Sequence, residues 1–254
     1  MKTELKILKI GGSVITDKSR GFFEKPREEE MTRIAEEIGA NPENLIVIHG
    51  AGSFGHPYVE KFGRNMTASA SILTHMACRR LNTLFCNALF ESGVKVLPIN
   101  PFSALRVDED LEIDEDFVVA LIEEGIVPVL HGDMVYNRSK KVFEVLSGDR
   151  ITFELARKLN VNRIGFATDA PGVIVDGEVQ EELIIEQDLL EFVEETEEAE
   201  TKSDVTGGMK GKLKSLLELP PHSEVLIFSG LEEGNILRFL NNEKVGTKIR
   251  KQRD

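Results

Sequence analysis

The sequence predicts an α/β fold in which a mainly parallel sheet is covered by helices on both faces. Short apolar runs alternate along the chain with longer segments of helical periodicity, which is typical of parallel strands joined by helical crossovers. These runs are apolar at nearly every position, which indicates burial on both faces of the sheet. Glycine-rich segments follow the first two runs, so both are expected at the carboxyl edge of the sheet, where ligands bind in such folds.

The predicted elements follow from this periodicity. Six apolar runs are expected to be strands: 5–10, 45–48, 94–99, 126–130, 163–168 and 224–228. Five intervening segments have helical periodicity: 27–39, 68–92, 114–124, 148–159 and 208–218. Two segments, 103–113 and 132–145, alternate in polarity around a polar tip and predict hairpins.

The acidic block 181–204 is the sharpest change in composition along the chain. Apolar positions such as Leu183, Ile184 and Leu189 predict a short docked helix there, followed by a surface loop. A solvated face is a better interpretation of the acidic residues than an interaction tail. We expect one domain over 1–254, with lobes of about 1–150 and 151–254.

Charge and composition exclude several classes of function. The formal net charge of -13 argues against a nucleic-acid surface, because binding along phosphates requires a basic face. No apolar run approaches the ~20 residues needed to span a bilayer, and the first residues lack a signal-peptide pattern. The two cysteines, Cys78 and Cys86, lack metal-ligand spacing and are expected to be core thiols. We therefore expect a cytoplasmic protein with no nucleic-acid or membrane partner.

The stretch HGAGSFGH, from His49 to His56, contains the G-x-G-x-x-G pattern after a strand and before a helix. That pattern is typical of dinucleotide binding, which also requires an acidic residue about 20 positions later to hold the ribose. The chain has no Asp or Glu from Phe62 to Phe90. The sequence therefore argues against NAD and leaves two histidines around a phosphate-type loop to be explained.

Three other segments carry small residues beside charged ones: KIGGSVITDK (9–18), SGD (147–149) and DVTGGMKGK (204–212). Small residues let the backbone approach phosphate oxygens, and helix N-termini direct N–H groups at anions. The last segment is not a Walker A loop, since its spacing and terminal residue differ. Several such segments in one chain favour a polyphosphate held from more than one side.

Three lysines, Lys9, Lys18 and Lys212, belong to these segments and could neutralise charge during phosphoryl transfer. Each lysine alone is more typical of a solvated surface, and only their shared placement favours a site. Asp149 begins a predicted helix, where it could be a cap or could hold active-site lysines in place. Asp169, after the fifth strand, could form a turn or contact a nucleotide.

The order of these motifs resembles the isopentenyl phosphate kinases of the amino acid kinase superfamily. KIGGSVITDK, HGAGSFGH, PFSALR, VPVLHGD, SGD, ATD and DVTGGMKGK occur in that order from Lys6 to about Ile249. The K-x-G-G-S and H-G-x-G motifs resemble the whole superfamily, whereas SFGH with DVTGGM-x-x-K resembles the isopentenyl phosphate branch. The resemblance implies a three-layer αβα sandwich, with the acceptor bound by the N-terminal part and MgATP by the C-terminal part. It also implies a homodimer.

The implied reaction is the ATP-dependent phosphorylation of isopentenyl phosphate to isopentenyl diphosphate, a step of an alternative mevalonate pathway. By position, His56 matches the histidine that contacts the acceptor phosphate, and Lys18 matches the lysine that stabilises the transferred group. The resemblance implies further contacts. Those to ATP, in this numbering, are Lys9, Gly11, Gly12, Ser13, Ala51, Gly52, Asp169, Gly208 and Lys212, and those to the acceptor are Gly50, Gly55 and Gly148. His49 is expected to be structural, hydrogen-bonded at the sheet edge and holding the shape of the loop.

Two departures from the family pattern bear on specificity. Pro171 stands where an acidic residue is common, which leaves the nucleotide preference open, and the segment after His56 is short. The predicted helix from Ser69 to Asn87 and residues 103–106 are expected to contribute to an isoprenoid tail pocket. Ile72, Leu73 and Met76 are candidates for it, although each alone is more typical of a core residue. Two alternatives stay open: another small-molecule kinase of the superfamily, such as a phosphonate-antibiotic (fosfomycin) kinase, or a non-catalytic nucleotide-binding sensor.

Overall fold

The computed structural model describes residues 4–19, 23–63, 66–108, 110–185, 216, 219–220 and 222–251. A single eight-stranded sheet runs through the molecule in the order β12-β14-β13-β9-β1-β2-β6-β3. All neighbouring pairs are parallel except β13 and β14, which are antiparallel. The prediction of a mainly parallel sheet is confirmed.

The strands of this sheet have the following bounds: β1 Lys6–Ile10, β2 Leu45–His49, β3 Val96–Pro98, β6 Val127–His131, β9 Arg163–Thr168, β12 Glu182–Ile185, β13 Glu224–Ser229 and β14 Thr247–Lys251. All six predicted strands are present, although the third is shorter than expected. The strands β12 and β14 were not predicted, because the apolar residues of β12 were expected in a helix and the alternating charged residues of β14 resemble a surface segment.

The helices have these bounds: α1 Gly12–Ile15, α2 Glu28–Ala40, α3 Gly52–Phe62, α4 Ala68–Glu91, α5 Pro101–Ala104, α6 Glu115–Glu123, α7 Gly148–Lys158 and α10 Asn235–Leu240. Four predicted helices are confirmed as α2, α4, α6 and α7. The fifth, expected at 208–218, lies outside the described residues except for Leu216. The helix expected after the HGAGSFG loop is present as α3, although it begins within the glycines, at Gly52. The short helix α1 was not predicted, because its glycines favour a loop interpretation.

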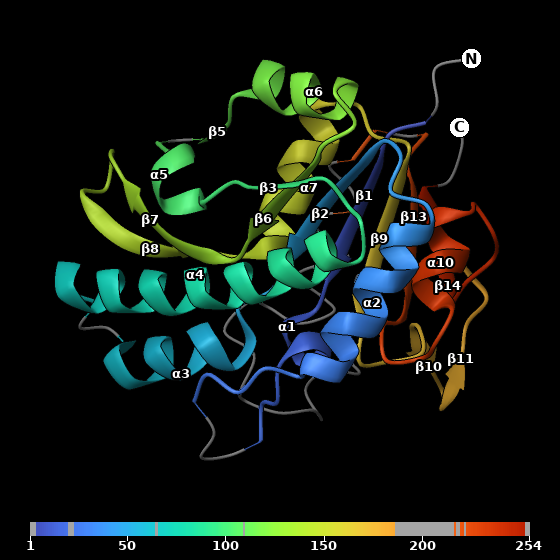
Figure 1. Cartoon of the computed structure of the whole chain (residues 1–254), viewed down its shortest axis with the longest axis horizontal. Coiled ribbons are helices and arrows are strands. Elements are labelled where there is room, and N and C mark those ends of the chain that lie inside the picture. The colour runs from blue at the N-terminus through green and yellow to red at the C-terminus, as the bar shows by residue number, and fades with distance from the viewer. Residues whose placement is uncertain are drawn as a thin grey trace.

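Side chains alternate between two cores on opposite faces of the sheet. Ile7, Ile46 and Ile48 pack with α6 and α7, whereas Leu8 and Val47 pack with α2 and α4. Figure 1 shows α2, α3 and α4 on one side of the strands and α6 and α7 on the other. The three-layer αβα sandwich is therefore confirmed.

A four-stranded sheet in the order β5-β4-β7-β8 stands at one end of the molecule (Figure 1). Its strands are β4 Arg106–Val107, β5 Leu111–Glu112, β7 Asp133–Asn137 and β8 Val142–Leu146, and they confirm both predicted hairpins. A two-stranded ribbon, β10 Ile174–Val175 with β11 Glu178–Val179, precedes β12.

The start of the acidic block corrects one prediction. Leu183 and Ile184 lie in β12, which pairs with β14, and not in a docked helix. The reason is tertiary: β14 offers a free parallel edge, and strand pairing overrides the helical spacing of a few apolar residues. The rest of the block, residues 186–204, lies outside the described residues. No helix within the described ranges is both long and apolar enough to cross a bilayer.

Candidate functional site

Most of the predicted site residues surround one cavity at the carboxyl ends of β1, β2, β6 and β9. It has a volume of about 250 Å³. Its walls include nearly all of the predicted residues that the structure describes: Lys9, Gly11, Gly12, Ser13, Lys18, Gly50, Ala51, Gly52, Gly55, His56, Gly148, Asp149 and Asp169. Segments from five parts of the chain therefore meet at one place.

The first two glycine loops touch each other through their backbones. A Cβ atom at Gly12 would lie 2.4 Å from the amide nitrogen of Gly52, which leaves no room for any side chain. Gly52 has a φ of +50°, and a Cβ there would lie 2.0 Å from Thr16 Oγ1. The glycines are therefore needed for close backbone packing as well as for room above the strands.

Gly132, which was not assigned to the site from the sequence, leaves a space beside two backbone amides, and this space is called the cradle below. A Cβ atom at Gly132 would lie 3.2 Å from the amide nitrogen of Gly148 and 3.6 Å from that of Ala51. Gly148 is the first residue of α7, so its N–H lies at the positive end of that helix. Backbone amides from two loops thus converge where the Gly132 side chain is missing, an arrangement suited to phosphate oxygens.

Lys9 and Asp149 form an ion pair at the floor of this cavity. Lys9 Nζ lies 2.6 Å from Asp149 Oδ1, and the two side chains are only 9% and 16% exposed. Lys9 projects from β1 toward α7, because odd-numbered positions of this strand face that helix. Of the two roles open to Asp149, the geometry supports that of holding a site lysine in place, while Ser147 is the residue that caps α7.

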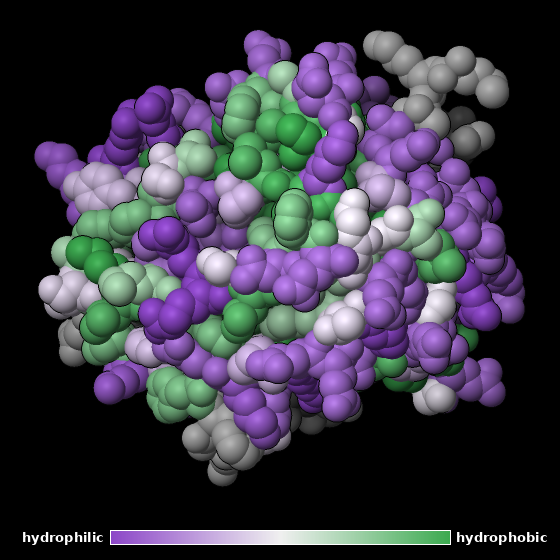
Figure 2. All heavy atoms as spheres, viewed as in Figure 1, coloured by the Kyte–Doolittle hydropathy of each residue, from purple (hydrophilic) through white to green (hydrophobic). Residues whose placement is uncertain are grey.

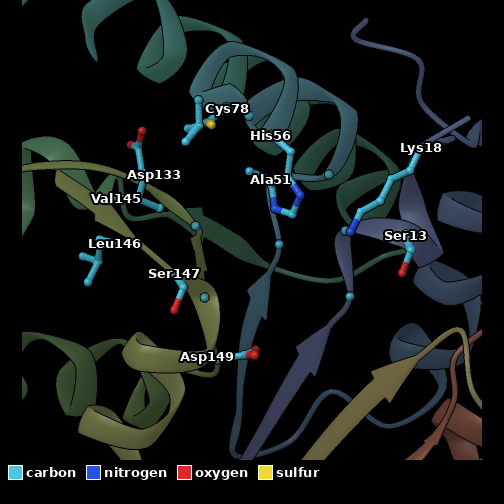
Figure 3. A pocket seen from close by; sticks show the side chains of 18 of the residues that line it. Ser13, Lys18, Ala51, His56, Cys78, Asp133, Val145, Leu146, Ser147 and Asp149 are labelled. Atoms are coloured by element: carbon cyan, nitrogen blue, oxygen red, sulfur yellow. The ribbon is translucent and has the colours of Figure 1, made fainter. Parts of the chain in front are cut away.

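Lys18 and His56 reach the cavity from different elements. His56 lies in α3, and Lys18 lies in the segment between α1 and α2. Figure 3 shows both side chains pointing into the same space, with Ser13 near Lys18 and Asp149 across the cavity. Lys18 is exposed and His56 is partly buried, so both can meet a ligand that enters from solvent.

His49 is separate from the cavity wall, as predicted. Its ring is fully buried, its Nδ1 lies 3.0 Å from the carbonyl oxygen of Gly50, and its Nε2 accepts from Asn82 at 3.0 Å. Burial lowers the pKa of His49 to about 4, so the ring is neutral at pH 7. The expectation of a structural histidine that holds the loop is confirmed.

The apolar end of the cavity is lined by α4, as expected, but by other residues of that helix than those predicted. Thr74 and Cys78 of α4 line it, together with Val59, Met134, Val145 and Leu146. Ile72, Leu73 and Met76 are instead about half exposed on the outer face of α4, at 48%, 48% and 49%. The helical phase explains the error, because the predicted residues and the lining residues lie on different faces of one helix. Residues 103–106 do not line the cavity.

Asp133 is a further residue that sequence analysis missed. Its carboxylate accepts from His75 Nδ1 at 2.7 Å and from its neighbour's amide, Met134 N–H, at 2.8 Å. Burial raises the pKa of Asp133, although these hydrogen bonds oppose the shift. The sequence did contain a signal, since His-Gly occurs at the ends of two strand-like runs, at 49–50 and again at 131–132.

Two predicted residues, Gly208 and Lys212, lie outside the described residues. No group of three or more His, Cys, Asp or Glu side chains that could hold a metal ion occurs among those that the structure does describe. The lysines and backbone amides that line the cavity are groups that bind anions.

Comparison with known proteins agrees with this geometry. Residues 4–229 match the model of the amino acid kinase family. The chain is 33% identical to the isopentenyl phosphate kinase of Methanothermobacter thermautotrophicus, over 96% of this chain and 98% of that protein. It is also 33% identical to the isopentenyl phosphate kinase of Haloferax volcanii, over 97% of this chain and 98% of that protein.

Solved structures show the same likeness. One described as X-ray structures of isopentenyl phosphate kinase aligns with a TM-score of 0.80 at 30% identity, covering 97% of this chain and 100% of that one. A product complex of the Thermoplasma acidophilum enzyme aligns with a TM-score of 0.77 at 26% identity, with the same coverage.

Proposed function

Because the chain belongs to the amino acid kinase family, and within it to the isopentenyl phosphate kinases, we propose that it phosphorylates isopentenyl phosphate with ATP. The products are isopentenyl diphosphate and ADP. The observation that carries the proposal is the single cavity in which Lys9, Lys18, His56 and the glycine loops meet. The alternatives of an antibiotic kinase or a nucleotide sensor have no comparable support.

The reaction brings two phosphate anions together, and their repulsion is the main obstacle. An acceptor oxygen attacks the γ-phosphorus of ATP, and the bond from that phosphorus to the β–γ bridging oxygen breaks as ADP leaves. The acceptor oxygen is already ionised near neutral pH, so no general base is required. The protein has to align the two groups and neutralise the charge that shifts between them.

Each cation of the cavity has a place in this scheme. His56 donates an N–H to the acceptor phosphate, and the bound dianion favours the charged imidazolium. Lys18 stabilises the transferred phosphoryl group, and Lys9, held by Asp149, contacts the ATP phosphates. The amides around Gly12, Ala51 and Gly148 bind phosphate oxygens without adding side chains that would crowd the site.

Mg²⁺ is proposed to enter with the nucleotide and not as a resident ion. Asp149 is engaged by Lys9, and Asp169 is an exposed carboxylate on the cavity wall. This donor set fits an ion held mainly by phosphate oxygens and water, which is how Mg²⁺ commonly binds with nucleotides. When bound, the ion would neutralise charge on the nucleotide phosphates.

We also propose that the acceptor is bound mainly by the first lobe and that the second lobe contributes to binding ATP. Residues 1–150 supply His56, Gly50, Gly55 and Gly148, which favours acceptor binding there, and they also supply Lys9 and the loop residues assigned to ATP. Residues 151–254 supply Asp169, and they include Gly208 and Lys212, which by resemblance contact ATP. Both cysteines are buried and unbridged, which is consistent with a cytoplasmic, reducing environment.

We propose that the chain acts as a homodimer and that α4 contributes to the interface. Ile72, Leu73, Met76, Leu84 and Phe90 are exposed along this helix, at spacings that place them on one face. Figure 2 shows hydrophobic atoms gathered over the first turns of α4. Exposed apolar patches of this kind are typical of interfaces.

The function is tested by a coupled ADP-release assay with isopentenyl phosphate, dimethylallyl phosphate and fosfomycin, each at the same concentration. We expect isopentenyl phosphate to give the highest kcat/KM. A higher kcat/KM with fosfomycin would support an antibiotic kinase. ADP release with none of the three, from protein that still binds ATP, would support the sensor.

A further inference from the structure

Two neighbouring strands, β2 and β6, each end in a histidine that is followed by a glycine, His49-Gly50 and His131-Gly132. The two histidines face each other in the parallel register, and their rings stack with centroids 5.5 Å apart. Both are fully buried. Each Nδ1 lies 3.0 to 3.1 Å from the carbonyl oxygen of the following glycine.

Asn82 of α4 distinguishes His49 from His131. Its Nδ2 lies 3.0 Å from His49 Nε2, and its Oδ1 is directed to Cys86 Sγ at 3.8 Å. An amide NH₂ can only donate, so His49 Nε2 must be the acceptor, and the single proton of the neutral ring must be on Nδ1. Among the described residues, His131 Nε2 has no such partner.

The proton on Nδ1 determines how the next peptide is oriented. His49 Nδ1–H donates to the Gly50 carbonyl, and in a trans peptide the following N–H, that of Ala51, points the opposite way. The Ala51 nitrogen lies near the empty Cβ position of Gly132, beside the Gly148 nitrogen. Within the described ranges, neither of these two amides donates to a protein group. The amides are therefore available to a phosphate in the cavity.

We propose that Asn82 and His49 are positioning residues for phosphoryl transfer, which act by holding the Ala51 N–H toward a phosphate oxygen. Asn82 fixes the tautomer of His49, His49 fixes the Gly50–Ala51 peptide, and that peptide completes the cradle over Gly132. Neither side chain touches the substrates. The inference rests on the proposed function, which supplies the phosphate that the amide binds.

The first experiment uses the wild-type protein and needs no turnover. Histidine ¹⁵N NMR is expected to show His49 as the neutral Nδ1–H tautomer at pH 7, and an Nε2–H tautomer would overturn the proposal. In alanine-labelled protein, titration with inorganic phosphate is expected to shift the Ala51 amide proton. An Ala51 amide that does not respond to phosphate would also overturn it.

The second experiment compares Asn82→Leu with Cys86→Ala, which removes the other partner of Asn82 without touching the histidine. In Asn82→Leu we expect the Nδ1–H tautomer to lose its dominance, the Ala51 response to weaken and kcat/KM to fall about 10-fold, the size of one lost hydrogen bond. Cys86→Ala is expected to keep the Nδ1–H tautomer, the Ala51 response and the wild-type kcat/KM. Kinetic constants unchanged in Asn82→Leu, with a changed tautomer, would contradict the proposal.

These measurements separate the two claims. A wild-type protein that phosphorylates none of the acceptors, yet shows the Nδ1–H tautomer and the Ala51 response, would refute the proposed function and leave standing the orientation of the phosphate-binding Ala51 amide by His49. An active protein with the Nε2–H tautomer would refute only the positioning role. Separate KM values for ATP and for the acceptor in Asn82→Leu identify which phosphate the Ala51 amide meets.

Discussion

At the scale of single residues, the chemistry depends on cations that an acidic chain gathers in one place. His56 faces the cavity from α3 and is assigned to the acceptor phosphate. In His56→Ala we expect kcat/KM for isopentenyl phosphate to fall by a factor between about 10 and about 150, which is the range for the loss of a hydrogen bond to a charged group. The ADP-release assay measures this, with His222→Ala, an exposed histidine away from the cavity, as control. Near-normal turnover in His56→Ala would refute the assignment.

Lys18 is assigned to the transferred group, so its contact should strengthen as the transition state forms. We expect Lys18→Ala to lower kcat by about 10-fold or more while KM for both substrates changes little. The exposed Lys244, which pairs with Glu181, provides a matched control in Lys244→Ala. A rise in KM with unchanged kcat would show that Lys18 binds the ground state and does not stabilise the transition state.

The site residues were predictable to different degrees. Lys9, Lys18 and His56 could be found because each belongs to a motif beside a glycine segment. Gly132 and Asp133 lie in the VPVLHGD motif but were not assigned to the site, since their roles depend on β6 lying beside β2 and on a Cβ that is absent. Ile72, Leu73 and Met76 were wrong for a related reason, because sequence gives the period of α4 but not which face meets the cavity.

At the scale of elements, the glycines of the loops have two separable functions: they leave space for a phosphate, and they let the loops pack closely together. One substitution tests each function. Gly132→Ala would place a Cβ 3.2 to 3.6 Å from two cradle amides without a backbone clash below 3 Å. We therefore expect KM for a phosphate substrate to rise several-fold, while the urea midpoint of unfolding changes little. A normal KM would show that the space over Gly132 holds no phosphate.

Gly12→Ala is the counterpart that should affect the fold. Its Cβ would lie 2.4 Å from the amide nitrogen of Gly52, and both loops are fixed by buried strands. We expect the free energy of unfolding to fall by about 1–3 kcal/mol, the cost of overpacking, as measured by urea titration. Wild-type stability in this variant would mean that the two loops can separate.

The elements also show where sequence patterns are informative. Central strands such as β1 and β2 are apolar on both faces and were predictable from that pattern alone. The strand β12 pairs only with β14 among the described residues, and β14 has charged residues at alternate positions and so gives no apolar run. Both α1 and α3 begin in glycines that are required by contact between loops, so the local sequence argues against a helix at α1 and hides the true start of the helix expected at α3.

At the scale of the whole molecule, two buried neutral histidines make stability depend on pH. Burial lowers the pKa of His49 to about 4 and that of His131 to about 3, against about 6.5 in the unfolded chain. As pH falls below 6.5, these histidines therefore become protonated in the unfolded state but stay neutral in the folded state, and the free energy of unfolding falls. For two such groups the fall between pH 7.5 and 5.5 is about 2–3 kcal/mol.

The measurement is urea unfolding at pH 7.5, 6.5 and 5.5, a window in which few carboxylates titrate. Asp133, whose pKa is raised by burial, binds a proton more readily in the folded state than in the unfolded state and so opposes this trend. The matched variant His131→Gln removes one of the two histidines, so its fall in unfolding free energy should be about half that of the wild type. Equal pH dependence in the two proteins would show that His131 does not stay neutral in the folded state.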